Sequence, residues 1–429
     1  MIKYIKDKWH VEEYRRLFSN FVSLSVLQGA NYILPLLTLP YLVRVLGAEK
    51  FGLLAFATAT VTYFMIITDY GFNLSATREV SIHRDDKEKL IEIFSAVMTI
   101  KFVLMILSFL LMTLLVFSFE KFRTEWKVYY LTFGMVVGQV LFPVWFFQGL
   151  EKMKFITILN MTAKIFFTIA IFIFVKEQSD YFIVPVCTSL GFIIAGLLSL
   201  IIIRKELGIS FKLQKLQSLT EQMKSGWHIF ISNIAISLYT VSTTFILGLF
   251  TNNTIVGYYS AGEKIVKAVQ GLYSPVSQSI YPFISRKVDE SFENGLIFLR
   301  KVLLLVSVIT FGLSCVLLGL SEYITILLLG YQYTESIVVV KILSFLPFII
   351  ALSNIFGIQT MLNFGKNKAF SRILISASIL NLILSIILVP VYQHIGSAIS
   401  VLFVEIFVST VMFIYLQLSD VKILRVSNV

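Results

Sequence analysis

Charged side chains inside apolar stretches are the residues of this chain most able to do chemistry. Glu263 and Lys267 stand four residues apart, a spacing at which two side chains on one helix face pair favourably. Gln270 continues the same face, and Lys264 stands beside it without a local partner. An ionisable group at the centre of a bilayer costs about 2.5–3.5 kcal/mol, so it normally faces a bundle interior or a wet cavity. This helix face is therefore predicted to line water.

Further cations point to the same chemistry. Lys101 and Lys164 lie about nine or ten residues inside apolar stretches, roughly 14 Å deep at 1.5 Å per residue. Clustered ammonium groups in a medium of low dielectric constant attract phosphate strongly, so the predicted guest is an anion. The residues predicted to bind it are Lys264, Lys267, Glu263, Gln270, Lys101, Lys164, Gln28, Asn31, Asn233 and Arg44. For Arg44, at the outer end of a stretch, snorkelling to the interface is an adequate explanation.

Two carboxyl groups are candidates for coupling transport to a proton. Asp69 and Glu263 lie in or beside apolar stretches, where burial favours the protonated form of a carboxyl group. A structural ion pair explains each of them equally well.

Catalytic and metal-binding patterns do not stand out in the sequence. The four histidines are scattered without a paired metal-ligand spacing, and both cysteines lie in apolar stretches. Neither a phosphate-binding glycine loop nor a nucleophile elbow occurs. We therefore expect no cofactor, no metal and no enzymatic reaction.

The elements that must position these residues are transmembrane helices. The chain is 57% hydrophobic and only 14% charged, with a mean hydropathy of +0.85, which is more apolar surface than a soluble fold can bury. A bilayer core needs roughly 20 apolar residues per helix. The sequence predicts an all-α membrane protein with about twelve such spans, at residues 18–43, 53–70, 91–119, 128–147, 155–175, 182–203, 227–250, 255–283, 296–320, 337–362, 373–391 and 395–416.

The distribution of basic residues orients these spans. Of the 36 Lys and Arg residues, twenty-five fall on one side of the predicted membrane, counting Arg300 and Lys301 at the start of the span 296–320, six fall on the other side and five lie deeper inside the spans. The positive-inside rule therefore predicts that both termini are cytoplasmic. Topology and attraction to anionic lipid also explain the net charge of +11, so no nucleic-acid partner is expected.

The spans divide into two halves. The longest polar connection separates six spans from six, which predicts an N-terminal six-helix lobe at 1–210, a cytoplasmic linker at 211–226 and a C-terminal six-helix lobe at 227–429. An even number of spans per half makes the halves parallel repeats about a pseudo-two-fold axis along the membrane normal, with a cavity expected in the cleft between them.

A weak internal similarity supports this repeat. At an offset of 205 residues, Gly52 falls on Gly257 and Gln28 falls on Asn233. Chance similarity between two apolar helices is the alternative explanation.

Three groups of residues resemble those of a known family. The run DYGFNLSATRE from Asp69 and the run WFFQGLEKMK from Trp145 are similar to segments of the Wzx-type O-antigen flippases, polysaccharide repeat-unit transporters of the MATE-like superfamily. Residues of the C-terminal half are similar as well, namely Asn354, Gln359, the run GKNK from Gly365, Asn381 and Pro390. The resemblance covers essentially the whole chain.

The resemblance implies a fold, a substrate and a location. It implies two six-helix bundles that work by alternating access, and a substrate that is an undecaprenyl-pyrophosphate-linked oligosaccharide. This substrate would move from the cytoplasmic to the periplasmic leaflet of a bacterial inner membrane during O-antigen and lipopolysaccharide biosynthesis. Implied partners are membrane lipid, the polysaccharide polymerase and the chain-length machinery. The lipid II flippase MurJ, which has two extra helices, is expected to fit less well.

Two rival functions share parts of this pattern. A MATE-like exporter of small cationic drugs has the same architecture but predicts an acidic cavity, whereas lysines outnumber acids here. A membrane polysaccharide polymerase or glycosyltransferase would use the same lipid-linked substrate but needs a large outer loop. A structural scaffold is disfavoured by the cost of intramembrane lysines.

Overall fold

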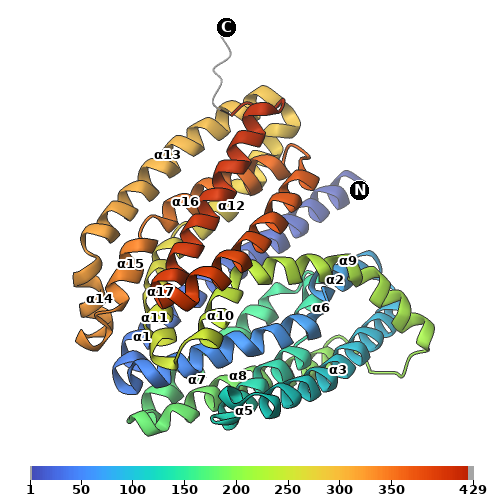
Figure 1. The fold of residues 1–429 in the computed structure, drawn as a ribbon. Helices are drawn as coiled ribbons and strands as arrows, with labels where there is room; N and C mark the ends of the chain where they lie inside the picture. The colour runs from blue at the N-terminus through green and yellow to red at the C-terminus, as the bar shows by residue number, and fades with distance from the viewer. Residues whose placement is uncertain (1, 424–429) are drawn as a thin grey trace. The chain divides into compact units, whose positions relative to one another are not determined.

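The computed structural model describes residues 2–423, with side chains other than those of residues 2–27, 32, 33, 239, 279, 282 and 290. All regular structure in this range is helical, which confirms the all-α prediction (Figure 1). Contacts divide the chain into two compact units. The N-terminal unit comprises the residues up to Thr38 together with Ala57–Ile234, and the C-terminal unit comprises Leu39–Phe56 together with the described residues from Ala235 onward.

These units differ from simple halves of the sequence. The first part of α9 (Leu216–Thr240) belongs to the N-terminal unit because it packs there, with the ring of Phe230 stacked on that of Tyr70 at 4.6 Å. The lobe and linker boundaries predicted at 1–210, 211–226 and 227–429 therefore stay a prediction.

The remaining helices of the N-terminal unit surround a core of buried aromatic and aliphatic side chains. Its α5, α7 and α8 lie side by side (Figure 1). The elements are the first and last parts of α1 (Ile2–Asp69), up to Thr38 and from Ala57, and then α2 (Phe72–Ile82), α3 (Lys87–Ser118), α4 (Glu120–Arg123), α5 (Trp126–Leu141), α6 (Val144–Gly149), α7 (Met153–Phe174), the 3₁₀ helix η1 (Gln178–Phe182) and α8 (Ile183–Lys205).

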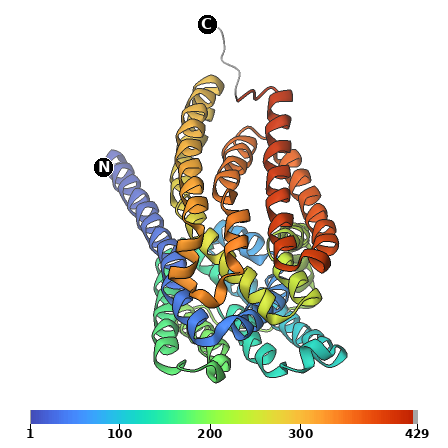
Figure 2. The same cartoon turned by 60° about the vertical axis from the view of Figure 1, so that its left-hand side comes forward.

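The C-terminal unit has a second core, built largely by α13, α16 and α17. In Figure 2 the two arms of α17, drawn in red, lie beside each other. The elements are α10 (Ser242–Phe250), α11 (Asn253–Gly271), α12 (Ser274–Glu290), α13 (Phe292–Gly319), α14 (Ser321–Leu329), the 3₁₀ helix η2 (Tyr331–Tyr333), α15 (Ser336–Leu343), α16 (Leu346–Asn354), the π-helix η3 (Ile355–Leu362) and α17 (Asn367–Leu418).

The helices have the length and composition of membrane spans. Within the described residues, eight segments are long and apolar enough to cross a bilayer, or nine if the pair Leu216–Leu238 and Ser242–Phe250, bent by 53°, is one span. Only 28% of the most apolar window of α3, and the same share of that of α13, is buried. Such exposed apolar surface requires lipid as its solvent, so the chain is a multi-pass membrane protein.

The count of twelve spans is not confirmed. Helix α1 and helix α17 each cover two predicted spans without an intervening loop. The break in α1 is at Gly47, whose φ of 68° is readily available only to glycine, and the break in α17 is at Gln393, with φ 51°. The predicted span 255–283 is not among the eight, because α11 ends at Gly271 and α12 carries many polar residues.

Glycines allow close helix crossings in the N-terminal unit. A Cβ atom on Gly138 of α5 would lie 2.4 Å from the Cβ of Phe192, and one on Gly134 would lie 2.6 Å from the Cβ of Ser189, both on α8. Small residues at such crossings let membrane helices gain packing contacts that lipid cannot supply.

A reciprocal glycine crossing ties residues 39–56 into the C-terminal unit. A Cβ atom on Gly52 would lie 1.8 Å from the carbonyl oxygen of Asn253, and one on Gly257 would lie 2.0 Å from that of Ala48. At the offset of 205 residues, Gly52 corresponds to Gly257 and Ala48 to Asn253. The two similar segments therefore make the same contact in both directions, as elements related by a two-fold axis do.

The segment that follows α17 is held by polar contacts outside the predicted spans. Lys366 and Asp420 form an ion pair at 2.5 Å, and their hydrogen bond raises the pKa of Lys366 and lowers that of Asp420. Arg300 of α13 donates to the carbonyl of Ile423 at 2.8 Å. Residues 420–423 are thus held by charge-assisted bonds.

Candidate functional site

An ion pair lies buried in the N-terminal unit. The Nζ atom of Lys101 on α3 is 3.6 Å from Oδ1 of Asp69, and the two side chains are only 2% and 11% exposed. Asp69 ends α1 where Tyr70 and Gly71 both adopt positive φ, so the chain turns sharply into α2. Two predicted site residues thus neutralise each other away from solvent.

A second lysine of this unit bonds to amides and not to an acid. Lys164 of α7 donates to Oδ1 of Asn31 on α1, and Asn31 donates to Oε1 of Gln28 at 3.0 Å. Lys164 is half-buried, and among the described side chains no carboxylate pairs with it. Three residues that the sequence predicted separately therefore form one polar chain with a net positive charge.

The stripe on α11 carries both of the other expected lysines. Lys267 pairs with Glu263 at 2.9 Å, with 54% of its side chain exposed, and the hydroxyl of Tyr259 donates to Glu263 at 3.4 Å. Lys264 places its ammonium 4.7 Å from the centre of the Phe51 ring. A ring face attracts a cation without cancelling its charge, so this stripe keeps one net positive charge.

The remaining predicted site residues are Arg44, Gln270 and Asn233. Arg44 donates to the carbonyl of Leu327 near the end of α14 at 2.5 Å. Gln270 and Asn233 are half-buried on α11 and α9. Because these residues belong to two separate compact units, their convergence in one chamber stays a prediction.

A polar cluster in the C-terminal unit was not predicted as part of the site. The Asn354 side-chain oxygen accepts from the hydroxyls of Tyr273 at 3.2 Å and of Ser277 at 2.7 Å. Gln359 donates to the Ser277 carbonyl at 2.9 Å and to its hydroxyl at 3.0 Å. Gln359 lies in the π-helix η3, a rare element often found at functional sites. The only signal in the sequence was that Asn354 and Gln359 belong to the family-like set.

The run from Trp145, by contrast, serves packing. Trp145, Phe146 and Phe147 are fully buried, and the Trp145 carbonyl accepts from the hydroxyl of Thr77 at 3.1 Å. A Cβ atom on Gly149 would lie 2.6 Å from side-chain atoms of Val80. The first half of this motif therefore packs α6 against α2.

Comparison with known sequences gives matches over most of the chain. A family described as "Polysaccharide biosynthesis protein" matches residues 17–288. A protein of Escherichia coli (strain K12) is 36% identical over 398 residues, covering 93% of this chain and 96% of the relative. A protein of Shigella dysenteriae is 29% identical over 389 residues, covering 91% and 97%. Both relatives carry the name "Putative O-antigen transporter".

Comparison with solved structures shows the same fold at low identity. The lipid II flippase MurJ in an inward closed conformation aligns with a TM-score of 0.71 and 15% identity, over 93% of this chain and 88% of that one. An inward-facing multidrug transporter of the MATE family aligns with a TM-score of 0.67 and 11% identity, over 89% and 93%. The expectation that MurJ fits less well than the O-antigen flippases stays a prediction, because these alignments compare the fold alone.

Proposed function

Because the chain belongs to the polysaccharide biosynthesis protein family, we propose that it is a flippase for an undecaprenyl-pyrophosphate-linked oligosaccharide, the repeat unit of an O-antigen or a related polysaccharide. The repeat unit moves from the cytoplasmic to the periplasmic leaflet of a bacterial inner membrane, and both termini of the protein are cytoplasmic. The proposal is one of transport without a chemical reaction, in keeping with the names of the relatives.

One observation carries the proposal. The relative that is 36% identical over 93% of this chain is named as an O-antigen transporter, and the match leaves no large part of either protein unaligned. The fold shared with MurJ and a MATE transporter supports transport by alternating access, since these share one architecture across different substrates.

We infer that Lys164, Lys264 and Lys267 supply the affinity for pyrophosphate. Lys164 offers an ammonium group, which suits phosphate oxygens. The neighbouring amides of Asn31 and Gln28 suit sugar hydroxyls. On α11, Lys264 keeps its charge over the Phe51 ring, and Lys267 adds an exposed ammonium already oriented by Glu263. Arg44, Gln270 and Asn233 complete the proposed contacts.

Proton coupling is a separable part of the proposal. A proton taken up by Asp69 or Glu263 would remove the negative charge that holds Lys101 or Lys267, and so release an ammonium group toward phosphate. Flux that is unaffected by a collapsed proton gradient would discard this part and leave the flippase proposal intact.

The proposal is tested by removing the ammonium groups. We expect Lys164→Ala, and the pair Lys264→Ala with Lys267→Ala, to lower surface polysaccharide about tenfold or more, because a hydrogen bond to a charged group contributes about 1.5–3 kcal/mol. Surface polysaccharide is measured at matched protein levels, with lipid-linked repeat units expected to accumulate inside the cell.

Matched controls come from exposed lysines of the same units. Lys154→Ala at the start of α7 and Lys368→Ala at the start of α17 remove a charge without touching the proposed contacts. Full polysaccharide display by the site variants, equal to that of these controls, would exclude the lysines from substrate binding.

Two acids within the predicted spans argue against a MATE-like exporter of cationic drugs. Asp69 and Glu263 are each paired with a lysine. Drug resistance in cells that express the chain, with unchanged polysaccharide display, would favour this rival.

A further inference from the structure

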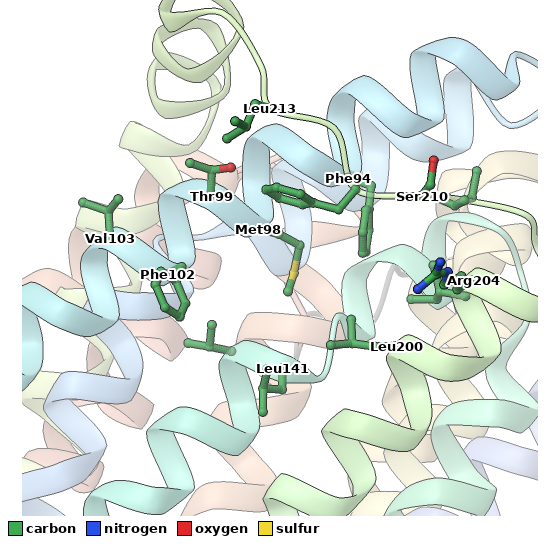
Figure 3. A pocket seen from close by; sticks show the side chains of 14 residues that line it. Phe94, Met98, Thr99, Phe102, Val103, Leu141, Leu200, Arg204, Ser210 and Leu213 are labelled. Carbon is green, nitrogen blue, oxygen red and sulfur yellow. The ribbon is translucent and has the colours of Figure 1, made fainter.

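The N-terminal unit contains an apolar cavity that the proposed transport site does not use. It has a volume of about 640 Å³ and lies between α3, the end of α5, the end of α8 and the connection at residues 206–215. Figure 3 shows Met98, Phe102, Leu141 and Leu200 around it. This volume is within the range of roughly 300–1,000 Å³ that is typical of pockets for small organic ligands.

The length of the apolar lining matches one leaflet of a bilayer. Phe94 and Val103 mark its extent along α3, and nine residues at 1.5 Å each span about 14 Å. Half of a hydrocarbon core of about 30 Å is about 15 Å. One acyl chain of a bilayer lipid therefore fits this lining, whereas an undecaprenyl chain is far longer than a single leaflet.

One end of the cavity is polar and cationic. The Arg204 guanidinium, in the last turn of α8, lies in Figure 3 on the opposite side of the lining from Phe102 and Val103. Ser210 contributes an exposed hydroxyl to the lining. Among the described residues no carboxylate pairs with Arg204, so its fork of donors is available to an anion.

The connection over the cavity has the pattern of a segment at the membrane interface. The Lys212 backbone donates to the hydroxyl of Ser95 at 3.0 Å, which fastens the connection to α3. Phe211 and Leu213 flank this bond and are 54% and 88% exposed. Alternating apolar and basic residues at a helix end suit the boundary between acyl chains and anionic headgroups.

We propose that this cavity binds one molecule of an anionic phospholipid as a resident lipid of the N-terminal unit. One acyl chain packs against Met98, Phe102 and Leu200, and the phosphate accepts hydrogen bonds from Arg204 and Ser210. On the orientation proposed above, the lipid comes from the cytoplasmic leaflet. By bridging α8 and residues 206–215, it stabilises the connection that leads into α9.

The test uses the purified full-length protein in detergent with phosphatidylglycerol as the probe. Native mass spectrometry counts bound lipid, and a thermal melt reports stabilisation. We expect one tightly bound phosphatidylglycerol, weakened about tenfold or more by Arg204→Gln, since a bidentate charge-assisted contact is lost. The control Arg372→Gln, an exposed arginine of α17, should bind like the wild type.

Two comparisons make the result decisive. Leu200→Trp fills the apolar middle of the cavity and should abolish the tight site with Arg204 intact. Because the Arg204 side chain is exposed, Arg204→Gln is expected to fold, so a loss of binding in it is not due to misfolding. Equal affinity for phosphatidylglycerol in Arg204→Gln and the wild type would overturn the proposal. So would displacement of phosphatidylglycerol by undecaprenyl phosphate, because the cavity would then belong to the substrate.

These outcomes are independent of the proposed function. Lipid binding is measured without transport, so its failure leaves the flippase proposal standing. Full polysaccharide display in the lysine variants, which would exclude those lysines from substrate binding, leaves the lipid site standing in turn.

Discussion

The two compact units hold the same kind of ion pair, and the two pairs differ in the exposure of the lysine. Lys101 and Asp69 in the N-terminal unit are 2% and 11% exposed, whereas Lys267 and Glu263 in the C-terminal unit are 54% and 15% exposed. Removing one partner of a buried pair strands the other charge in a medium of low dielectric constant, while an exposed charge regains water. The pair of Lys101 and Asp69 is therefore expected to hold structure, whereas the pair of Lys267 and Glu263 is the one that we propose to exchange its partner for a substrate phosphate.

The largest expected effect is on the buried pair. Lys101→Ala leaves Asp69 buried without its cation, which costs about 3–5 kcal/mol of stability. A large fall in melting temperature and in the yield of folded protein should result. Replacing both residues, as Lys101→Met with Asp69→Leu, should recover much of that loss. Wild-type melting of Lys101→Ala would show that the pair is not structural.

Substitutions at the glycine crossings are expected to lower stability by an intermediate amount, and they allow a second comparison of the two units. Gly138→Ala in the N-terminal unit and Gly257→Ala in the C-terminal unit each force a Cβ atom within 2.4 Å of a neighbouring atom. Overpacking of this kind costs about 1–3 kcal/mol.

The matched control for these crossings is Gly312→Ala. A Cβ atom there meets nothing within 4 Å, so this variant should melt at or slightly above the wild-type temperature. If Gly52→Ala and Gly257→Ala differ strongly in melting temperature, the reciprocal contact does not behave as a symmetric one.

The smallest effect is expected for the pair whose lysine is exposed. Lys267→Ala should change stability by about 1 kcal/mol, because an ammonium group that is 54% exposed contributes little and the remaining Glu263 keeps the hydroxyl of Tyr259 as a donor. Polysaccharide display should fall nevertheless when Lys264 is replaced as well. A melting temperature lowered as much as in Lys101→Ala would erase the contrast between the two units.

The sequence predicted the local features of the fold well. Apolar stretches at 91–119 and 296–320 became α3 and α13, and the i,i+4 spacing predicted the pair of Glu263 and Lys267. Both depend on residues near each other in the chain. The count of twelve spans is not confirmed, because Gly47 and Gln393 break their helices without a loop that separates two spans.

Sequence patterns could not predict the partners of the other lysines. Lys101 meets Asp69 from a different helix, Lys164 meets Asn31 across 133 residues, and Lys264 lies over Phe51. Each was predicted as a cavity residue on the same grounds, yet one is neutralised, one bonds to amides and one faces a ring. Similar charge and depth gave no basis for telling them apart.

By itself the sequence determined that this is a polytopic, helical membrane protein of a recognisable family, because hydropathy, charge bias and motif runs are properties of contiguous residues. Only the tertiary structure decided which lysines retain an unbalanced charge, that Gly52 and Gly257 cross reciprocally, and that α3, α5, α8 and residues 206–215 line an apolar cavity. These are matters of distance between helices, and packing sets that distance by contacts between residues far apart in the chain.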